Sequence, residues 1–365
     1  MAISLLNNKR SAIPLDPHPL CNSCNVRFAA IALLAFVSLA APAGPVFTNP
    51  LLPSGADPWI TVRDGFYYYM QTTGTNLTIW KTQDVTDLKN ATKKVVWTPP
   101  ATGPYSHDIW APEIHFVAGK WYIYFAADDG RNETHRIWAL ENASPDPLIG
   151  EWVMKGKVSD PSDKWAIDAT VFQNRDQLYL AWSGWPADRN VEQDIYIARL
   201  RNPWTVDGNR VRLSAPQYGW EKHGDLPDSR HVNVNEGPEA LFRGANLFLT
   251  FSASGCWTNE YELGMLQTST DADLMNPSSW KKSRQPVFTM SPQAHAFGTG
   301  HNGFFKSPDG KEDWIVYHSN PDTHGGCGPQ RSPRAQPFGW KPDGTPDFGK
   351  PAPLGTPLPK PSGTP

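Results

Sequence analysis

The sequence has only four cysteines in 365 residues, no extended basic run and, beyond its first 43 residues, no long apolar run. The formal net charge of −3 and the lack of clustered lysine and arginine argue against a nucleic-acid partner. No later segment is apolar enough to span a bilayer. What the chain does contain is 16 tryptophans, 36 prolines and 29 glycines, which indicates a turn-rich, aromatic-rich protein with little helix.

The first 43 residues have the pattern of a secretory signal. Arg27 precedes an apolar run over residues 28–37, and the small residues Ala41-Pro42-Ala43 follow. We therefore expect a secreted, extracellular protein that begins near Gly44 and has no membrane association after cleavage. An uncleaved signal anchor is the alternative, because the stretch before Arg27 is long for a signal peptide.

Cysteines and glycosylation motifs agree with this compartment. Cys21 and Cys24 fall in the leader, so Cys256 and Cys327 remain, and an oxidising environment allows them to pair. Four Asn-x-Ser/Thr motifs predict a glycoprotein, and they begin at Asn76, Asn90, Asn132 and Asn142.

A unit recurs from Phe47 onward, in which a short turn leads into a strand dense in aromatic residues. The five strands are residues 66–69, 121–125, 178–182, 247–251 and 314–317. Their turns contain the glycine, asparagine and aspartate that tight hairpins favour. Both faces of these strands are apolar, so both need cover, which predicts an all-β, five-bladed β-propeller. A two-sheet sandwich is the alternative, but it gives no reason for the repetition.

One polar residue lies upstream of each aromatic strand, at intervals of about 60 residues. These residues are Asp57, Glu113, Asp168, Glu236 and His301. Because the first strand of each blade lines the central channel of a propeller, we expect all five to converge there. Glu236 precedes Gly237-Pro238, a backbone corner that would hold its carboxylate at the mouth of a hairpin. Glu239, three residues later, is expected on the opposite face of the strand.

Six motifs together resemble glycoside hydrolase family 43, over a region from about Asn49 to about Gly349. They are residues 54–59, 109–113, 166–170, 235–238, 298–302 and 331–338. The resemblance implies a five-bladed propeller and an inverting enzyme that acts on arabinose- and xylose-containing polymers. It also implies Asp57 as general base, Asp168 as the residue that orients and tunes, and Glu236 as general acid.

Elementary acid–base chemistry agrees with these roles. An inverting glycosidase needs one ionised and one protonated carboxyl group. Asp57 is the better candidate to stay ionised, because aspartate has a lower intrinsic pKa than glutamate. A neighbouring carboxylate such as Asp168 would raise the pKa of Glu236.

The resemblance suggests further site residues. Arg334 resembles the arginine that contacts the sugar, with a surface arginine as the alternative. Trp110 and Trp59 are candidates to stack on sugar faces. Glu113 is a candidate to line the pocket and bind substrate, with a purely structural role as the alternative. His301 resembles a histidine that lies beside a bound calcium in several members, so the resemblance implies Ca²⁺ in the channel, with a metal-free channel histidine as the alternative. The chemistry itself requires no cofactor.

Neighbouring blades would bring Cys256 and Cys327 together near the channel mouth, so we favour a disulfide over two free thiols. The expected domains are a signal region over 1–43, a catalytic propeller over 44–349 and a proline-rich flexible tail over 350–365.

The predicted function is a secreted, monomeric exo-acting α-L-arabinofuranosidase. It would release L-arabinose from α-1,5-arabinan or arabinoxylan of plant cell walls. Endo-α-1,5-arabinanase and β-xylosidase are alternatives within the family. A non-catalytic carbohydrate-binding propeller is the alternative outside enzymes, although the presence of all three acids counts against it.

Overall fold

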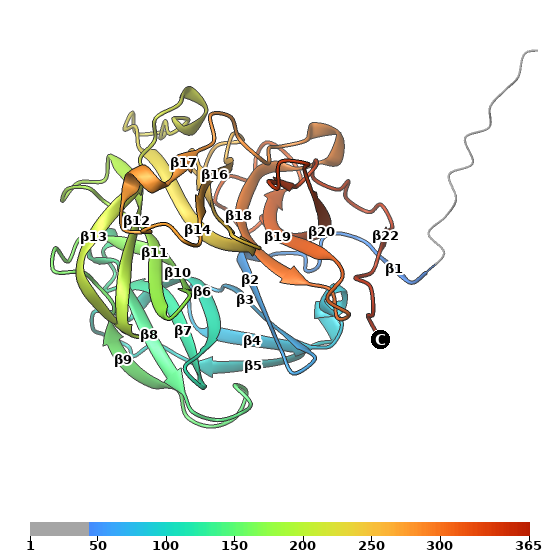
Figure 1. The fold of residues 1–365 in the computed structure, drawn as a ribbon, viewed down its shortest axis with the longest axis horizontal. Coiled ribbons are helices and arrows are strands. Elements are labelled where there is room, and N and C mark those ends of the chain that lie inside the picture. The colour runs from blue at the N-terminus through green and yellow to red at the C-terminus, as the bar shows by residue number, and fades with distance from the viewer. Residues whose placement is uncertain (1–43) are drawn as a thin grey trace, which may run out of the picture. The chain divides into compact units, whose positions relative to one another are not determined.

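The computed structural model describes residues 44–365, and its regular structure is almost entirely β-strand (Figure 1). The predicted signal region over residues 1–43, with Cys21 and Cys24, lies outside the described residues. Within residues 44–365, no helix has the length and apolarity needed to cross a membrane. Over the same residues, five short 3-10 helices occur in loops, at Val85–Asn90, Asn132–Thr134, Gly219–Glu221, Pro277–Ser279 and Pro292–Ala294.

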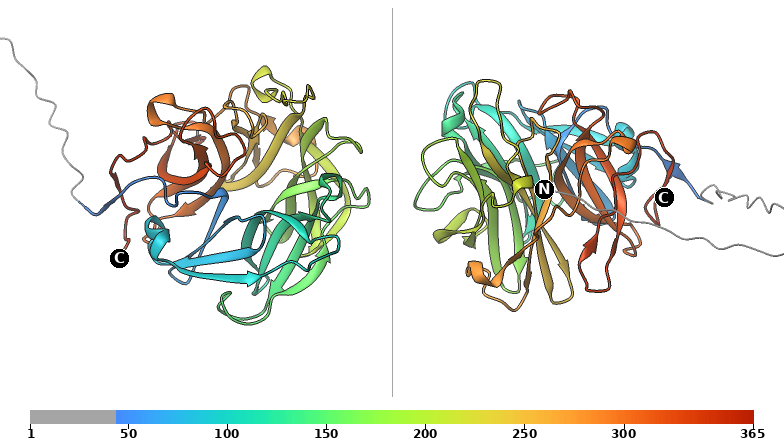
Figure 2. Two further views of the ribbon diagram at one scale, coloured as in Figure 1. Left: turned by 180° about the vertical axis from the view of Figure 1, so that it is seen from behind. Right: turned by 90° about the horizontal axis from the view of Figure 1, so that it is seen from above.

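The strands form five blades around a common axis, as the face-on and edge-on views show (Figures 1 and 2). Each blade uses four consecutive strands, and each first strand lies innermost. Blades 1 and 2 comprise β2 Ala56–Arg63, β3 Phe66–Thr72, β4 Leu77–Thr82, β5 Thr92–Trp97, β6 His107–Val117, β7 Lys120–Asp128, β8 Arg136–Asn142 and β9 Val153–Lys157. Blade 3 comprises β10 Ala166–Asn174, β11 Gln177–Gly184, β12 Glu192–Asn202 and β13 Thr205–Ser214. Blades 4 and 5 comprise β14 Asn233–Arg243, β15 Asn246–Ala253, β16 Glu262–Ser269, β17 Lys281–Lys282, β18 Phe297–Lys306, β19 Asp313–Asn320, β20 Ser332–Trp340 and β21 Pro346–Asp347.

The hydrophobic core consists of separate layers between neighbouring blades. One layer between blades 1 and 2 contains Tyr68, Ile114 and Trp121, and corresponding layers follow between each later pair of blades. The fifth layer joins blade 5 to blade 1 through residues such as Tyr69 and Trp314. Each aromatic strand is thus buried on both faces by its neighbours, which confirms the predicted five-bladed propeller.

The two ends of the described chain meet beside blades 5 and 1. β1 (Val46–Phe47) pairs with β22 (Leu358–Pro359) in a small antiparallel sheet. The Lys360 ammonium binds Asp84 at 2.5 Å, and the Ser362 backbone N–H donates to Glu312 at 3.0 Å. The expectation of a flexible tail over 350–365 is therefore wrong for this structure, because specific polar contacts tie the segment to the propeller.

Candidate active site

Local backbone irregularities set the direction of the channel residues. The pairing of each innermost strand with its neighbour shifts register near its start, which marks a β-bulge. Bulges re-aim side chains locally. A residue with positive φ lies in each bulge, at Asp57, Ala111, Asp168, Gly237 and His301, with φ of 54°, 41°, 57°, 54° and 46°. Such a conformation is strained for residues other than glycine, and such strain often accompanies functional sites.

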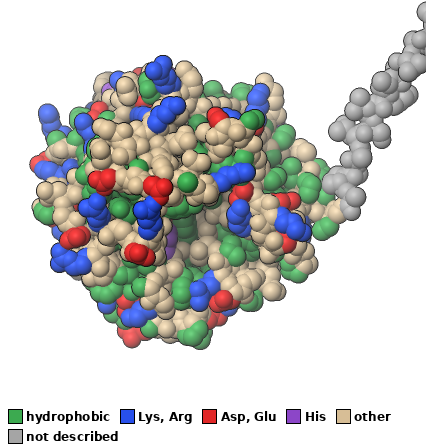
Figure 3. Space-filling model, in the orientation of Figure 1, with side chains coloured by type: hydrophobic (Ala, Val, Ile, Leu, Met, Phe, Trp, Pro, Cys, Tyr) green, Lys and Arg blue, Asp and Glu red, His purple; other side chains and the backbone are tan. Residues whose placement is uncertain are grey.

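A pocket of about 630 Å³ opens at the channel end where these bulges lie. The space-filling view shows the molecule hollowed near its centre, around the propeller axis (Figure 3). Five predicted site residues line the pocket, namely Asp57, Trp110, Asp168, Glu236 and His301. The structure thus brings the three proposed catalytic acids to one place from blades 1, 3 and 4.

Asp57 is held by partners from blades 1 and 5. Its Oδ2 accepts from the Thr72 hydroxyl at 2.5 Å, while its Oδ1 lies 3.2 Å from His301 Nδ1 and 3.5 Å from Arg331 Nη1. Burial raises the pKa of this carboxyl, but the nearby His301 and Arg331 lower it more, and the net pKa is well below the usual value. Asp57 is therefore ionised at neutral pH, as a general base must be.

His318 also contacts Asp57, but as a neutral ring. The Asp57 backbone N–H donates to His318 Nδ1 at 3.1 Å, so this nitrogen is an acceptor and carries no proton. Burial lowers the pKa of His318 far below its usual value, and it also lowers that of His301. Near neutral pH, the Arg331 guanidinium is therefore the formal positive charge beside Asp57.

Glu236 and Asp168 are a coupled acidic pair. Glu236 Oε1 accepts from the Tyr261 hydroxyl at 2.9 Å, and Asp168 Oδ2 accepts from the Gly237 backbone N–H at 3.0 Å. Burial raises the pKa of Glu236 to about 7, with Asp57 adding to the shift. Burial and the charge of Glu236 raise the pKa of Asp168. The pair therefore retains a proton near neutral pH, which suits a general acid.

His301 lies between Asp57 and this acidic pair. One ligand atom from each of Asp168, Glu236 and His301 falls within 4.8 Å of the others. A divalent cation bound directly by Glu236 would hold that carboxyl ionised, which conflicts with a role as proton donor, and calcium prefers six to eight oxygen ligands. These three side chains alone do not fit a resident calcium, and we derive no step from a metal.

The tryptophans differ in their access to the pocket. Trp110 lines it and stacks on His135, with ring centroids 4.1 Å apart. Trp165, also in the pocket lining, stacks on the buried Trp185 at 4.8 Å. Trp59 instead donates to the Ile114 carbonyl at 2.9 Å and belongs to the core layer between blades 1 and 2. The prediction that Trp59 contacts the substrate is therefore wrong, because its ring packs in the core.

Glu113 lies deeper in the channel than predicted. In blade 2 the positive-φ bulge residue is Ala111, so Glu113 comes two residues further along its strand and does not line the pocket. Its Oε2 lies 2.8 Å from His115 Nε2, and burial and the charge of Glu239 raise its pKa. The prediction that Glu113 lines the pocket is thus wrong.

Glu239 also turns towards the channel, contrary to prediction. Strand alternation would place it opposite Glu236, but β14 shifts register between these two residues. Its Oε2 accepts from the Thr170 hydroxyl of β10 at 3.1 Å, and its side chain is buried. We call Glu113 and Glu239 the deep acidic pair.

Arg334 does not reach the pocket. Its side chain is fully buried in blade 5, where Nη2 donates to the Asn320 carbonyl at 3.2 Å. Of the two arginines in this motif, the one that lines the pocket is Arg331, the last loop residue before β20. The expectation of a sugar contact from Arg334 is therefore wrong.

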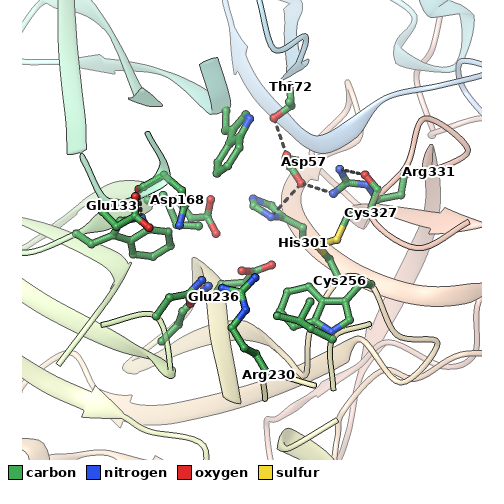
Figure 4. Close-up of a pocket in the computed structure, with 18 residues that line it drawn as sticks. Asp57, Thr72, Glu133, Asp168, Arg230, Glu236, Cys256, His301, Cys327 and Arg331 are labelled. Carbon is green, nitrogen blue, oxygen red and sulfur yellow. Dashed lines mark hydrogen bonds and ion pairs between the residues drawn. A yellow bond between two sulfur atoms is a disulfide. The ribbon is translucent and has the colours of Figure 1, made fainter. Parts of the chain in front are cut away.

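Cys256 and Cys327 form a disulfide, which confirms the predicted pairing, and both line the pocket (Figure 4). Sequence reasoning missed Arg331, Trp257 and Tyr261. Arg331 lies in the same motif as Arg334, and the motif alone does not indicate which of the two arginines reaches the pocket. Tyr261 and Trp257 stand in loops without a distinctive pattern.

Comparisons with known proteins agree with this site. A sequence model of glycosyl hydrolases family 43 matches residues 47–346. An extracellular exo-α-(1→5)-L-arabinofuranosidase of Streptomyces avermitilis is 41% identical over 88% of this chain and 68% of its own length. An α-L-arabinofuranosidase 43 of Humicola insolens is 38% identical over 90% of this chain and 69% of its own. The crystal structure of an α-L-arabinofuranosidase from Lactobacillus brevis superposes with a TM-score of 0.79 at 38% identity, covering 85% of this chain and 98% of that one. The chain belongs to glycosyl hydrolase family 43.

Proposed function

We propose that this protein is an extracellular, exo-acting α-L-arabinofuranosidase. It would release L-arabinose from the ends of α-1,5-linked arabinan or from arabinoxylan. The observation that carries the proposal is the convergence of Asp57, Asp168 and Glu236 in one pocket. The chain is also 37–41% identical to three proteins that are named α-L-arabinofuranosidases. We also expect the protein to be a monomer.

In the proposed reaction, Asp57 and Glu236 act on opposite sides of the bond. Asp57 accepts a proton from a water molecule, whose oxygen attacks the anomeric carbon. Glu236 gives its proton to the departing glycosidic oxygen as the bond to the anomeric carbon breaks. Asp168 is oriented by the Gly237 backbone, and the charge repulsion between Asp168 and Glu236 keeps a proton on the pair. The attack from one face inverts the anomeric configuration.

Two measurements, one on linear arabinan and one on an α-arabinoside, test the proposal. Linear α-1,5-arabinan should yield arabinose alone among early products, and proton NMR of an α-arabinoside digest should first show the β-anomer. A ladder of oligosaccharides would indicate endo action, and early α-anomer would make Asp57 a nucleophile. Binding of arabinan without any reducing sugar would identify a non-catalytic binding protein.

A further inference from the structure

The Cys256–Cys327 disulfide lies at a junction of three loops around the pocket mouth. Cys256 belongs to the loop after β15, and Cys327 to the loop between β19 and β20. The Cys256 loop is anchored to a third loop, because the Gly255 backbone N–H donates to the His223 carbonyl at 2.8 Å and Trp257 Nε1 donates to the Asp225 carbonyl at 3.0 Å.

The Cys327 loop is rich in glycine, and the Asn320 amide at its start donates to the Gly326 carbonyl at 2.9 Å. It contains Gly325, Gly326 and Gly328 and forms no strand between residues 321 and 331. Glycine leaves the backbone unusually free, so a loop of this composition needs external ties to hold one conformation. The disulfide supplies such a tie, from the anchored Cys256 loop to the glycine-rich loop.

Arg331 connects this loop to the proposed base. Its Nη2 donates to the Cys327 carbonyl at 2.7 Å and its Nε to the Gly328 carbonyl at 3.4 Å. Its remaining nitrogen, Nη1, lies 3.5 Å from Asp57 Oδ1. Figure 4 shows this chain of contacts, from the disulfide through Cys327 and Arg331 to Asp57. The carbonyl oxygen of Cys327, a residue of the disulfide, therefore orients the Arg331 guanidinium beside Asp57.

We propose that the Cys256–Cys327 disulfide positions Arg331 and, through it, Asp57, so that full activity requires the oxidised disulfide. The inference rests on the proposed function, since it assigns a role in the same reaction. A disulfide also stabilises a fold by restricting the unfolded chain. If the disulfide only stabilised the fold, its reduction would lower the melting temperature. The activity that the folded protein loses on reduction would then not depend on the presence of Arg331.

A double-mutant cycle separates positioning from simple stabilisation. The kcat and KM for dinitrophenyl α-L-arabinofuranoside are measured with the disulfide intact and after its removal, either by dithiothreitol with alkylation to count thiols or by the Cys256→Ser/Cys327→Ser variant. Each comparison is made in the wild type, in Arg331→Met and in Arg230→Met. Arg230 is the matched control, because it lines the same pocket but pairs with Asp228 instead of Cys327. Circular dichroism at the assay temperature identifies the folded samples.

We expect disulfide removal to lower kcat/KM by roughly tenfold in the wild type and in Arg230→Met. In Arg331→Met the further loss should be less than about twofold, because the group being positioned is already gone. An equal loss in Arg331→Met, or no loss in the wild type, overturns the inference. Inactivity of the intact wild type on every arabinoside would instead overturn the proposed function.

Discussion

Two groups of acidic residues occupy the same channel but have different environments. Asp57, Asp168 and Glu236 lie in the bulges at its open end, whereas the deep acidic pair of Glu113 and Glu239 lies further along the same set of strands. Glu113 follows its bulge residue by two positions, which at about 3.3 Å per residue places it roughly 7 Å deeper. Carboxyl groups on equivalent strands, the innermost strands of the blades, therefore lie in two different environments.

The difference lies in the partners of the carboxyl groups. At the open end, Asp57 faces the Arg331 guanidinium and loses its proton, while Glu236, beside Asp168, keeps a pKa of about 7. For the deep acidic pair, burial is the first cause that raises the pKa of both Glu113 and Glu239, and neither has a lysine or arginine partner among the ion pairs of residues 44–365. Opposed protonation states, which an acid–base mechanism needs, thus arise from position rather than from residue type.

The largest expected effect comes from replacing the two acids with opposed roles. Asp57→Ala and Glu236→Ala should each lower the rate on arabinan by about 10²–10⁴. On a dinitrophenyl arabinofuranoside, Glu236→Ala should recover much of the loss, because this leaving group departs without a proton. Asp57→Ala should recover little, since water still needs a base. Steady-state kinetics on both substrates measure this, and rescue of Asp57→Ala instead would exchange the two roles.

Removing one charge at the open end tests the coupling of Asp168 and Glu236. Asp168→Asn should lower kcat by about tenfold or more, and it should move the alkaline limb of the pH profile to lower pH. The sign follows because Glu236 acts in its protonated form. The charge of Glu236 raises the pKa of Asp168, and this repulsion is mutual, so replacing Asp168 with a neutral residue lowers the pKa of Glu236. The profile of kcat/KM against pH on arabinan checks this. An unmoved alkaline limb would show that burial and Asp57, without Asp168, set the pKa of Glu236.

Gly237 separates the open-end acid Glu236 from the deep Glu239. Its φ is +54°, and a Cβ there would lie 3.2 Å from the His301 ring. Gly237→Ala should therefore cost about 1 kcal/mol in stability and lower kcat/KM by roughly tenfold.

Gly244 supplies the matched control for this change. Its φ is +55°, but a Cβ there meets nothing within 4 Å. Gly244→Ala should thus carry a similar stability cost with unchanged kcat/KM. Thermal melts and kinetics of the two variants compare them, and equal losses of activity would mean that backbone strain alone matters.

The sequence was sufficient for features that repeat or belong to short motifs. The five aromatic strands predicted the blades, because each needs cover on both faces, and the motifs around Asp57, Asp168 and Glu236 predicted the acids that converge. Register was harder to predict. Alanine is not favoured at positive φ, so nothing in the sequence indicated that Ala111 occupies the bulge of blade 2 and displaces Glu113 inwards.

Long-range contacts were the other source of error. Arg331 and Arg334 share one motif, and which of them reaches the pocket depends on β20 beginning at Ser332, between them. A proline-rich composition predicted a flexible tail after residue 349. The contacts of Lys360 with Asp84 and of Ser362 with Glu312 join distant parts of the chain, and composition does not contain that information.

Among the acidic residues, the smallest effect on activity is expected for the deep acidic pair. Its difference from the three acids at the open end is tested by measuring the melting temperature. Burial raises the pKa of Glu113 in the folded protein. Glu113 has a lower pKa in the unfolded chain than in the folded protein, so the unfolded chain loses this proton at a lower pH. The stability that Glu113 contributes is therefore complete below its unfolded pKa and declines as the pH rises above it. Glu113→Gln keeps the shape and an acceptor for His115 but does not titrate. Its melting temperature should therefore exceed that of the wild type by roughly 2 °C or more at pH 7, with a smaller difference at pH 4, while kcat on arabinan stays within about threefold. Calorimetry at the two pH values and one kinetic series measure both, and a hundredfold loss of kcat would place Glu113 among the catalytic acids and remove the distinction between the two groups.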